Sequence, residues 1–528
     1  MNPAQSSVDP LPEGQPAPED QPTPEGVGST PAEDVGSTPA DDNAHDDGEA
    51  PARSVMIAGE MLNWSDLHPS DGRPATSGPV PAELLAAVLR PTDSVLVAGP
   101  HSLELLEQVA KTAASVDVLT RSAPDAEEIA EAFGVRVFCG SLDHFGPEHG
   151  KPAYDVVVAL DGLPRLVGPD TLVMSWTDAL GVLKGRLAPE GRLLLAAENS
   201  FGIERLVQPD PTVTVPRDED WPRDLAGDTA PPSGLKAVKA ALDAAELPVT
   251  KTYAIYPTLA EASVALTEVE GALPAAVVAR AVAGRFSGPT LTDPYRTTQD
   301  AVAAGLGSEL AAGWYFVVGD AADAPEVLPA GVVPDGPGVL LEEQLFAALR
   351  IDDQAALRRT VQAYVTWLRA QPADVAAVAA PDNVIADGTA YRVFGDGVAV
   401  NGRGDALVVA QLGRFVRRAL EAGARAPWTA GSTPRDVTSR LASTTGLVVT
   451  DELWASVAEN NEMIRPQGSA EQLATIARLA QELSEASTQA TWFEGQLKGI
   501  RMSKPYRVGM AVLNPARVVV KRVRRVVR

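Results

Sequence analysis

Three side chains that can exchange protons follow the ends of predicted strands. Asp161 comes directly after the fourth predicted strand, Glu198 after the fifth, and His101 lies in the turn after the first. Carboxylates and imidazoles are common general bases, and the carboxyl ends of parallel strands meet at one edge of a sheet. We therefore take Asp161, Glu198 and His101 as candidate catalytic residues. Helix capping and loop hydration remain open as an alternative for the two carboxylates.

The elements that must position these residues are apolar segments of about six residues that alternate with amphipathic helices. This alternation predicts a parallel sheet covered on both faces. Two further strands, over 250–255 and 262–266, would complete a doubly wound, Rossmann-like α/β fold. The five parallel strands are expected over 94–98, 115–120, 135–139, 155–160 and 192–197, with helices over 81–89, 103–113, 124–133 and 172–187.

The first turn of this predicted sheet reads Gly-Pro-His-Ser-Leu from Gly99 to Leu103. Cofactor loops usually place several glycines here so that the backbone can approach a ligand closely. The order of elements over residues 80–266 resembles the class I S-adenosylmethionine-dependent methyltransferases. It is most similar to the two-domain branch found in bacterial cell-surface polysaccharide clusters. Segments 198–203 (ENSFGI), 235–257 and 313–318 (GWYFVV) also resemble that branch, and we expect 313–318 at the start of the second domain.

The resemblance implies that S-adenosylmethionine would be bound at Gly99, Ser102, Arg121 and Ser141. The residues at these places depart from the family pattern. The acid of the family's first strand falls on Val97, and its ribose-binding acid falls near Arg121. A serine, Ser141, stands where the family has the acid that meets adenine. Each carboxylate that the family would bring to the cofactor is thus displaced or replaced.

Two functions follow from this resemblance. The first is a divergent class I methyltransferase that acts on a sugar or glycan intermediate of cell-envelope polysaccharide synthesis, with a glycan or small molecule as methyl acceptor. The second is a catalytically inactive, methyltransferase-shaped scaffold that docks glycan-assembly enzymes. The motifs support the first and the missing carboxylates support the second, so both remain open.

The chain divides into five predicted parts, which are a disordered acidic, proline-rich tail over 1–52, the methyltransferase-like Rossmann domain over 53–272, a mixed and mainly helical accessory domain over 273–465, an amphipathic helix over 466–500, and a basic tail over 501–528. The first tail cannot bury enough apolar surface to offset the entropy of ordering it. In the helix, apolar residues recur at steps of three and four, as is typical of an amphipathic helix or a coiled coil.

Charge and composition narrow the setting of the protein. The formal net charge is -26, which argues against a nucleic-acid partner because phosphates would be repelled. The single cysteine, Cys139, fits a reducing cytoplasm. No apolar run approaches the roughly 18 residues of a membrane span, and the N-terminus lacks the features of a signal peptide. We expect a cytoplasmic protein, peripheral at the inner membrane face, whose residues 470–528 bind anionic lipid or a glycosyltransferase partner.

Two other clusters favour a structural interpretation. The four potential ligands between Asp143 and His149 flank a Gly-Pro turn, so we expect a hydrated loop and no metal site. The segment from Asp382 to Asp396 is similar to the catalytic loop of aminoglycoside-phosphotransferase kinases. It lacks the upstream His-x-Asp and a matching lysine. Two turns that flank a short hairpin account for the same residues.

Overall fold

The computed structural model describes residues 54–68, 73–168, 171, 174–208, 231–286, 290–321, 323–421, 432–457 and 469–502. The acidic tail predicted over 1–52 lies outside these ranges, as does the basic tail beyond Met502. No helix in the described ranges has both the length and the apolar character that crossing a membrane requires.

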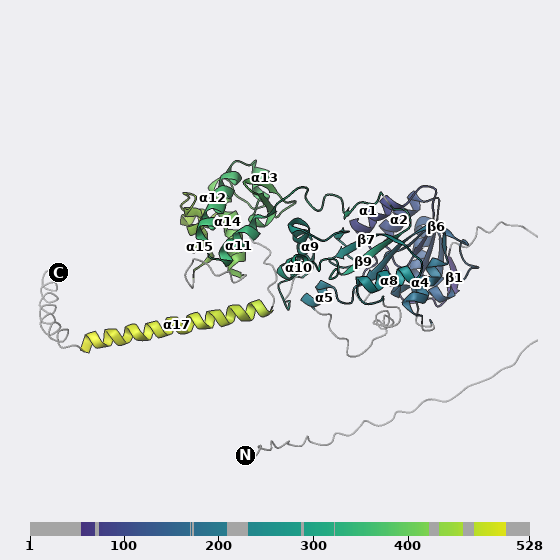
Figure 1. The fold of residues 1–528 in the computed structure, drawn as a ribbon, viewed down its shortest axis with the longest axis horizontal. Coiled ribbons are helices and arrows are strands. Elements are labelled where there is room, and N and C mark those ends of the chain that lie inside the picture. Colours follow the sequence, from purple (N-terminus) through teal and green to yellow (C-terminus); the bar gives the residue numbers. More distant parts are fainter. Residues whose placement is uncertain are drawn as a thin grey trace, which may run out of the picture. The chain divides into compact units, whose positions relative to one another are not determined.

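A ten-stranded sheet organises the first part of the chain, and its strands are the dense group of arrows in Figure 1. The strand order is β1-β4-β3-β2-β5-β6-β9-β7-β8-β10, with β1 to β6 parallel to one another and β9 antiparallel to both β6 and β7. The strands are β1 (Ser54–Ala58), β2 (Ser94–Ala98), β3 (Ser115–Thr120), β4 (Arg136–Gly140), β5 (Tyr154–Ala159), β6 (Leu187–Glu198), β7 (Val249–Tyr256), β8 (Val264–Leu266), β9 (Gly313–Val318) and β10 (Val327–Leu328).

Helices cover both faces of this sheet, which confirms the predicted Rossmann-like α/β class. Alternation along β2 shows the two layers, because Val95 and Val97 pack with one group of helices and Leu96 and Ala98 with the other. The first group is α1 (Pro79–Val88), α2 (Leu103–Thr112) and α3 (Ala123–Phe133), and the second includes α4 (Trp176–Lys184), α5 (Ile203–Val207), α8 (Leu235–Ala244) and α9 (Ala272–Arg285).

The strand Gly313–Val318 lies inside the first sheet. The expectation that it begins the second domain is therefore wrong. As β9 it pairs with β6 on one side and β7 on the other, so that Phe316 faces Leu195 and Thr252. All six of its residues are buried. The reason is the antiparallel return of the chain through α9 and α10 (Pro294–Ala303), which brings an apolar strand into the gap between β6 and β7.

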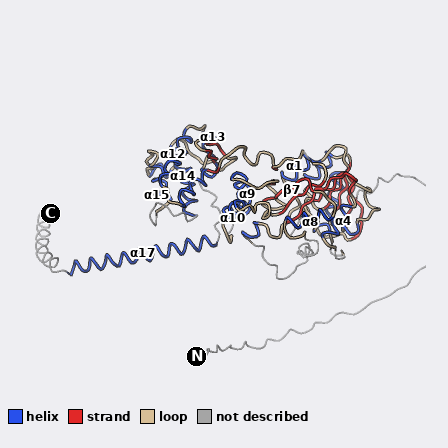
Figure 2. Tube along the Cα trace, in the orientation of Figure 1, coloured by secondary structure: helices blue, strands red, loops and turns tan. Residues whose placement is uncertain are grey.

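The part of the chain after β10 builds a smaller core of its own. A three-stranded antiparallel sheet, in the order β11-β12-β13, lies among helices, as Figure 2 shows by colour. The hairpin β12–β13 confirms the short hairpin that was expected in the kinase-like segment. The elements are β11 (Val339–Leu340), α11 (Leu341–Arg350), α12 (Gln354–Arg369), α13 (Ala373–Val378), β12 (Val384–Asp387), β13 (Ala390–Val393), α14 (Asp405–Glu421), α15 (Pro434–Ser443) and α16 (Asp451–Ala455).

The kinase-like Asp382 serves this core as a buried ion-pair partner. It lies in a short 3-10 helix before β12, where it accepts from Arg418 and from Arg414 Nη2 (3.1 Å). Arg418 also donates to Glu342 Oε2 over 2.7 Å. The side-chain amide of Asn383 donates to two backbone carbonyls. These contacts hold α14 against α11 and β12.

The last described element is α17 (Ser469–Met502), which coincides with the predicted helix from residue 469 to residue 500, while residues 466–468 of that prediction lie outside the described residues. It is the long yellow helix in Figure 1.

Candidate functional site

The first turn of the sheet joins β2 to α2 through a glycine in a left-handed conformation. Gly99, directly after β2, has φ +88°, a conformation that residues with a Cβ rarely adopt. Ser102 is the N-cap of α2, and its side chain accepts from Leu105 N over 3.4 Å. A Cβ built on Gly99 would lie 3.5 Å from Leu166 Cδ2 and 3.9 Å from Asp161 Cβ. The space beside this turn therefore holds side chains of the loop after β5.

His101, a candidate base, is buried beneath this turn with both ring nitrogens engaged. Its Nε2 accepts from Leu160 N over 3.3 Å, so Nδ1 carries the proton and donates to Gly99 O over 3.0 Å. Burial lowers the pKa of His101 and outweighs the opposing hydrogen bond to Gly99 and the charge of Asp161. The imidazole is therefore neutral, and it ties the end of β2 to the end of β5.

Arg121, at the end of β3, forms a buried pair with Asp66 from the N-terminal segment. Its Nε donates to Asp66 Oδ2 and its Nη2 to Oδ1, both over 2.8 Å, while Nη1 donates to Val167 O over 3.0 Å. Neither side chain is more than 2% exposed. Burial alone raises the pKa of Asp66, but the hydrogen bonds and charge of Arg121 outweigh it and hold that pKa below its ordinary value. Asp66 thus fills the place beside Arg121.

Asp161, the second candidate, is buried in a similar pair. Arg165 Nε donates to Asp161 Oδ2 over 2.7 Å, and Arg165 Nη2 donates to Oδ1. The hydroxyl of Thr76 lies 3.2 Å from the same Oδ1. Arg165 Nη1 lies 3.9 Å from Asp66 Oδ1, which joins the two ion pairs into one network under the edge. Both oxygens of the Asp161 carboxylate therefore take part in hydrogen bonds within the chain.

The N-terminal segment that supplies Asp66 and Thr76 crosses the carboxyl ends of three strands, and we call residues 59–68 and 73–78 the strap. Met61 N donates to Arg121 O over 2.7 Å beside β3. Further along, Thr76 N donates to Pro100 O over 3.2 Å beside β2. The strap is also fixed to the first turn of α3, because Asp125 accepts from Asp66 N over 2.8 Å. It thus covers the edge where a ligand of this fold would bind.

Ser141, after β4, contacts the strap and the loop after β5. Its hydroxyl lies 2.5 Å from Thr171 Oγ1 and accepts from Gly168 N over 3.2 Å. A Cβ on Gly59 would lie 2.6 Å from Ser141 Cβ, and a Cβ on Gly168 would lie 2.3 Å from Gly59 O. Glycine is required at both positions because the two backbones approach so closely.

Glu198, the third candidate, lies at the rim of the edge and is partly exposed. It accepts from Arg205 Nη2, and its Oε2 lies 3.7 Å from Arg73 Nη2 of the strap. A cavity of about 10 Å³ separates Glu198 from Asp161 and Trp176. That volume is about what one water molecule needs. At the rim of the edge, Glu198 therefore lies between two cations, Arg205 and Arg73 of the strap.

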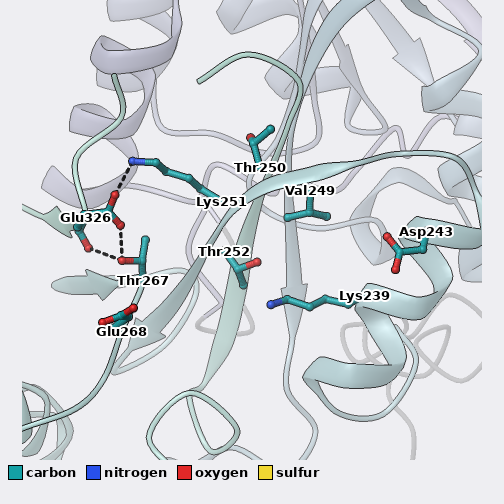
Figure 3. Close-up of a pocket in the computed structure, with 9 residues that line it drawn as sticks. All are labelled: Lys239, Asp243, Val249, Thr250, Lys251, Thr252, Thr267, Glu268 and Glu326. Atoms are coloured by element: carbon teal, nitrogen blue, oxygen red, sulfur yellow. Dashed lines mark hydrogen bonds and ion pairs between the residues drawn. The ribbon is translucent and has the colours of Figure 1, made fainter. Parts of the chain in front are cut away.

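A larger cavity, of about 440 Å³, opens at the amino end of β7, and sequence reasoning did not predict it. Figure 3 shows Lys251 and Thr267 turned toward Glu326, whose oxygens they contact over 2.8 and 2.5 Å. Lys239 and Asp243 of α8 form the other wall. Positively charged lysines and negatively charged carboxylates line this open cavity together. No motif at a strand end in the sequence indicates that a cavity lies here.

The residues that decide the character of the main site, Asp66 and Arg165, were missing from the sequence prediction. Asp66 lies in a stretch before the first predicted strand, with no motif around it. The pairing of Arg165 with Asp161 could have been suspected, because the two residues are four positions apart in the sequence. The four potential ligands in the loop that we expect to be hydrated form two separate pairs. His144 Nε2 lies 3.5 Å from Asp143 Oδ2 and His149 Nε2 lies 3.6 Å from Glu148 Oε1.

Neither a protein-family model nor a curated protein sequence matches the chain. Similar solved structures include a SAM-dependent methyltransferase from Geobacter sulfurreducens in complex with S-adenosyl-L-homocysteine, with 17% identity, a TM-score of 0.24, and coverage of 46% of this chain and 92% of that one. A putative methyltransferase in complex with the Haloferax volcanii Trm112 activator has 16% identity and a TM-score of 0.27, and the alignment covers 46% of this chain and 87% of that one. Geranyl diphosphate C-methyltransferase from Streptomyces coelicolor A3(2) has 14% identity, a TM-score of 0.25, and coverage of 45% and 73%.

The described residues do not fit S-adenosylmethionine at the edge of the sheet. Leu166 faces Gly99, Asp66 faces Arg121, and Ser141 faces Gly168. Three of the four predicted contact positions are therefore occupied by another part of the same chain. A bound cofactor would have to displace a buried ion pair, and separating such partners costs about 3–5 kcal/mol.

Proposed function

We propose that this chain is a non-catalytic scaffold built on a methyltransferase-like fold. One observation carries the proposal, which is the buried Asp66–Arg121 pair that the strap places over the ends of the strands. In a site that binds a nucleoside, the polar groups at the strand ends are open to the ligand. Here they are satisfied within the chain, because His101 bonds to Gly99 and Leu160 through its two ring nitrogens and Asp161 accepts from Arg165.

The partners of the scaffold are proposed from the sequence resemblance. Segments similar to the polysaccharide-cluster branch suggest glycan-assembly enzymes of cell-envelope synthesis. Residues 501–528 contain nine bases and no acid, which suits the anionic inner face of a membrane or an acidic partner. The scaffold would then hold glycan enzymes near the membrane without itself modifying the glycan.

Calorimetric titration with S-adenosylmethionine and S-adenosylhomocysteine tests the proposal. At about 1 mM ligand, the full chain should release no binding heat, although this concentration detects binding as weak as about -4 kcal/mol. Catalytic transfer of labelled methyl groups to a lipid-linked glycan acceptor should likewise be absent. Binding in the micromolar range, or methyl transfer by the wild-type chain, would refute the scaffold.

A second candidate is the divergent methyltransferase, favoured by the retained turn at Gly99 and the N-terminus of α2 beside it. It requires that the strap leave the edge before the cofactor binds. The variant Asp66→Ala separates the two candidates, because it removes the carboxylate that fills the place beside Arg121. If the variant binds S-adenosylmethionine and the wild type does not, the edge is a cofactor site that the strap closes. If neither binds, the scaffold proposal stands.

A further inference from the structure

The long helix α17 presents an apolar seam to solvent. Six of its larger apolar side chains are between 51% and 71% exposed, which is far above the exposure of side chains in the cores of this chain. Five of the six, all except Trp492, lie on a seven-residue repeat between residues 476 and 497. In that repeat every first and fourth position is apolar, and two alanines fill the remaining places. The seam consists of Ile476, Leu479, Leu483, Ala486, Ala490, Phe493 and Leu497.

The spacing of the seam points to another helix as its cover. A repeat of 3.5 residues keeps in phase only with a partner helix that winds around it, because a straight helix of 3.6 residues per turn drifts by about 20° per heptad. An apolar stripe that faces a flat surface would follow the straight helix, and over three heptads it would therefore drift away from the positions of the seam. The first and fourth positions instead stay apolar throughout, as knobs for the holes of a facing helix.

A lipid surface fits the same helix poorly. Residues 469–497 contain four acids, Glu471, Glu482, Glu485 and Glu494, against the single base Arg478. Helices that lie on anionic membranes carry Lys and Arg on the polar face. The seam segment has the opposite charge, so the basic residues after it, and not the seam, suit lipid.

A second copy of this chain matches the seam on size and charge. Two small residues, Ala486 and Ala490, lie at the middle, and larger ones lie at both ends. Two antiparallel copies would set Leu479 opposite Leu497 and Leu483 opposite Phe493, with alanine opposite alanine. The flanking positions whose side chains are described are Ala480, Ser487, Gln489, Glu494 and Gln496, so no like charges would face each other across them.

We propose that α17 forms an antiparallel two-stranded coiled coil with α17 of a second copy, which makes the protein a symmetric dimer. The antiparallel direction follows from the tail, since residues 501–528 contain nine bases and no acid. A parallel pair would bring the two tails together, whereas an antiparallel pair with this pairing separates the ends of the two helices by about 40 Å, at a rise of about 1.5 Å per residue. The dimer does not rest on the scaffold proposal, and it would give a scaffold two docking tails.

Sedimentation of the full chain at a series of concentrations tests the dimer. The wild type should sediment as a dimer, and the variant Leu483→Glu/Phe493→Glu as a monomer, because four buried carboxylates would meet at the seam. The control is Gln481→Glu/Thr488→Glu, which adds the same charge on the opposite side of the helix and should leave the dimer intact. Far-ultraviolet circular dichroism verifies that the folded body persists in both variants.

Disulfide formation tests the direction of the two helices. Cys139 is buried, so an added cysteine reports on the seam alone. Ala486→Cys mixed with Ala490→Cys should give the crosslinked heterodimer, and each variant alone should crosslink much less. Crosslinking of Ala486→Cys with itself would overturn the antiparallel arrangement. A monomeric wild type, or a dimer that survives the two glutamates in the seam, would overturn the coiled coil itself. Loss of binding to vesicles of anionic lipid on the same substitutions, without a dimer, would assign the seam to a membrane.

Discussion

Arg121 and Asp66, which lie 55 residues apart in sequence, meet as a buried two-point ion pair at the carboxyl edge of the sheet. Their side chains are 0% and 2% exposed. The pair places a carboxylate from the strap on a guanidinium from the end of β3. Because of this contact, the end of β3, where the cofactor was predicted to bind, is buried.

Removal of one partner should therefore be costly. We expect Asp66→Ala to lower the free energy of unfolding by about 3–5 kcal/mol, because it leaves the charge of Arg121 buried without its carboxylate. Urea denaturation followed by circular dichroism measures the change. The exposed pair His68–Glu128 is the control, and His68→Ala should cost less than about 1 kcal/mol. Equal losses for the two variants would contradict the buried pair as a structural element.

The close approach of the strap to the loop after β5 predicts opposite effects for two glycine substitutions. Gly168→Ala should destabilise the protein by about 1–3 kcal/mol, because its Cβ would lie 2.3 Å from the backbone oxygen of Gly59. Gly181→Ala, inside α4 with no atom within 4 Å of the added Cβ, should stabilise it by about 0.5–1 kcal/mol. Thermal unfolding of the two variants gives the signs, and the prediction fails if Gly168→Ala is neutral.

His101 should make the protein less stable below neutral pH. Its pKa is lowered in the fold, chiefly by burial, so the unfolded chain binds a proton near pH 6.5 that the folded chain does not. Stability from this residue is thus complete above pH 6.5. It is lost as the pH falls, by at most about 1.4 kcal/mol per pH unit. His101→Gln should reduce the slope of unfolding free energy between pH 7 and pH 5. An unchanged slope would mean that another group titrates there.

Glu204 of α5 should have the reverse dependence. Burial is the main cause that raises its pKa to about 7, and its Oε2 has no hydrogen-bond partner among the residues that the structure describes. The folded chain then binds a proton that the unfolded chain has released, so stability falls as the pH rises from about 4.5 through 7. Glu204→Gln should be more stable than the wild type at pH 8, by about 3 kcal/mol at most, and the gain should vanish near pH 4. Denaturation curves at the two pH values test this, with Glu190→Gln at an exposed position as control.

Much of the fold could be predicted from local patterns. Short apolar runs such as Ser94–Ala98 and Tyr154–Ala159 are strands because their residues are buried on both faces, and burial on both faces requires residues that are apolar in succession. Ser102 and the glycine at 134 mark the start of α2 and the end of α3 through capping, which is also local. The segment Gly313–Val318 was recognisable as a strand, but its pairing with β6 and β7 was not, since pairing depends on where the chain returns.

The site was predicted only as a set of positions. By itself the sequence determined that Gly99, Arg121, Ser141 and Asp161 follow strand ends, because strand length and turn residues are local properties. Tertiary structure alone decided what lies beside them. Asp66 reaches Arg121 from a segment with no motif of its own, and the pair forms because burial of either charge is tolerable only beside the other. The choice between an open cofactor edge and a closed one therefore depends on long-range packing.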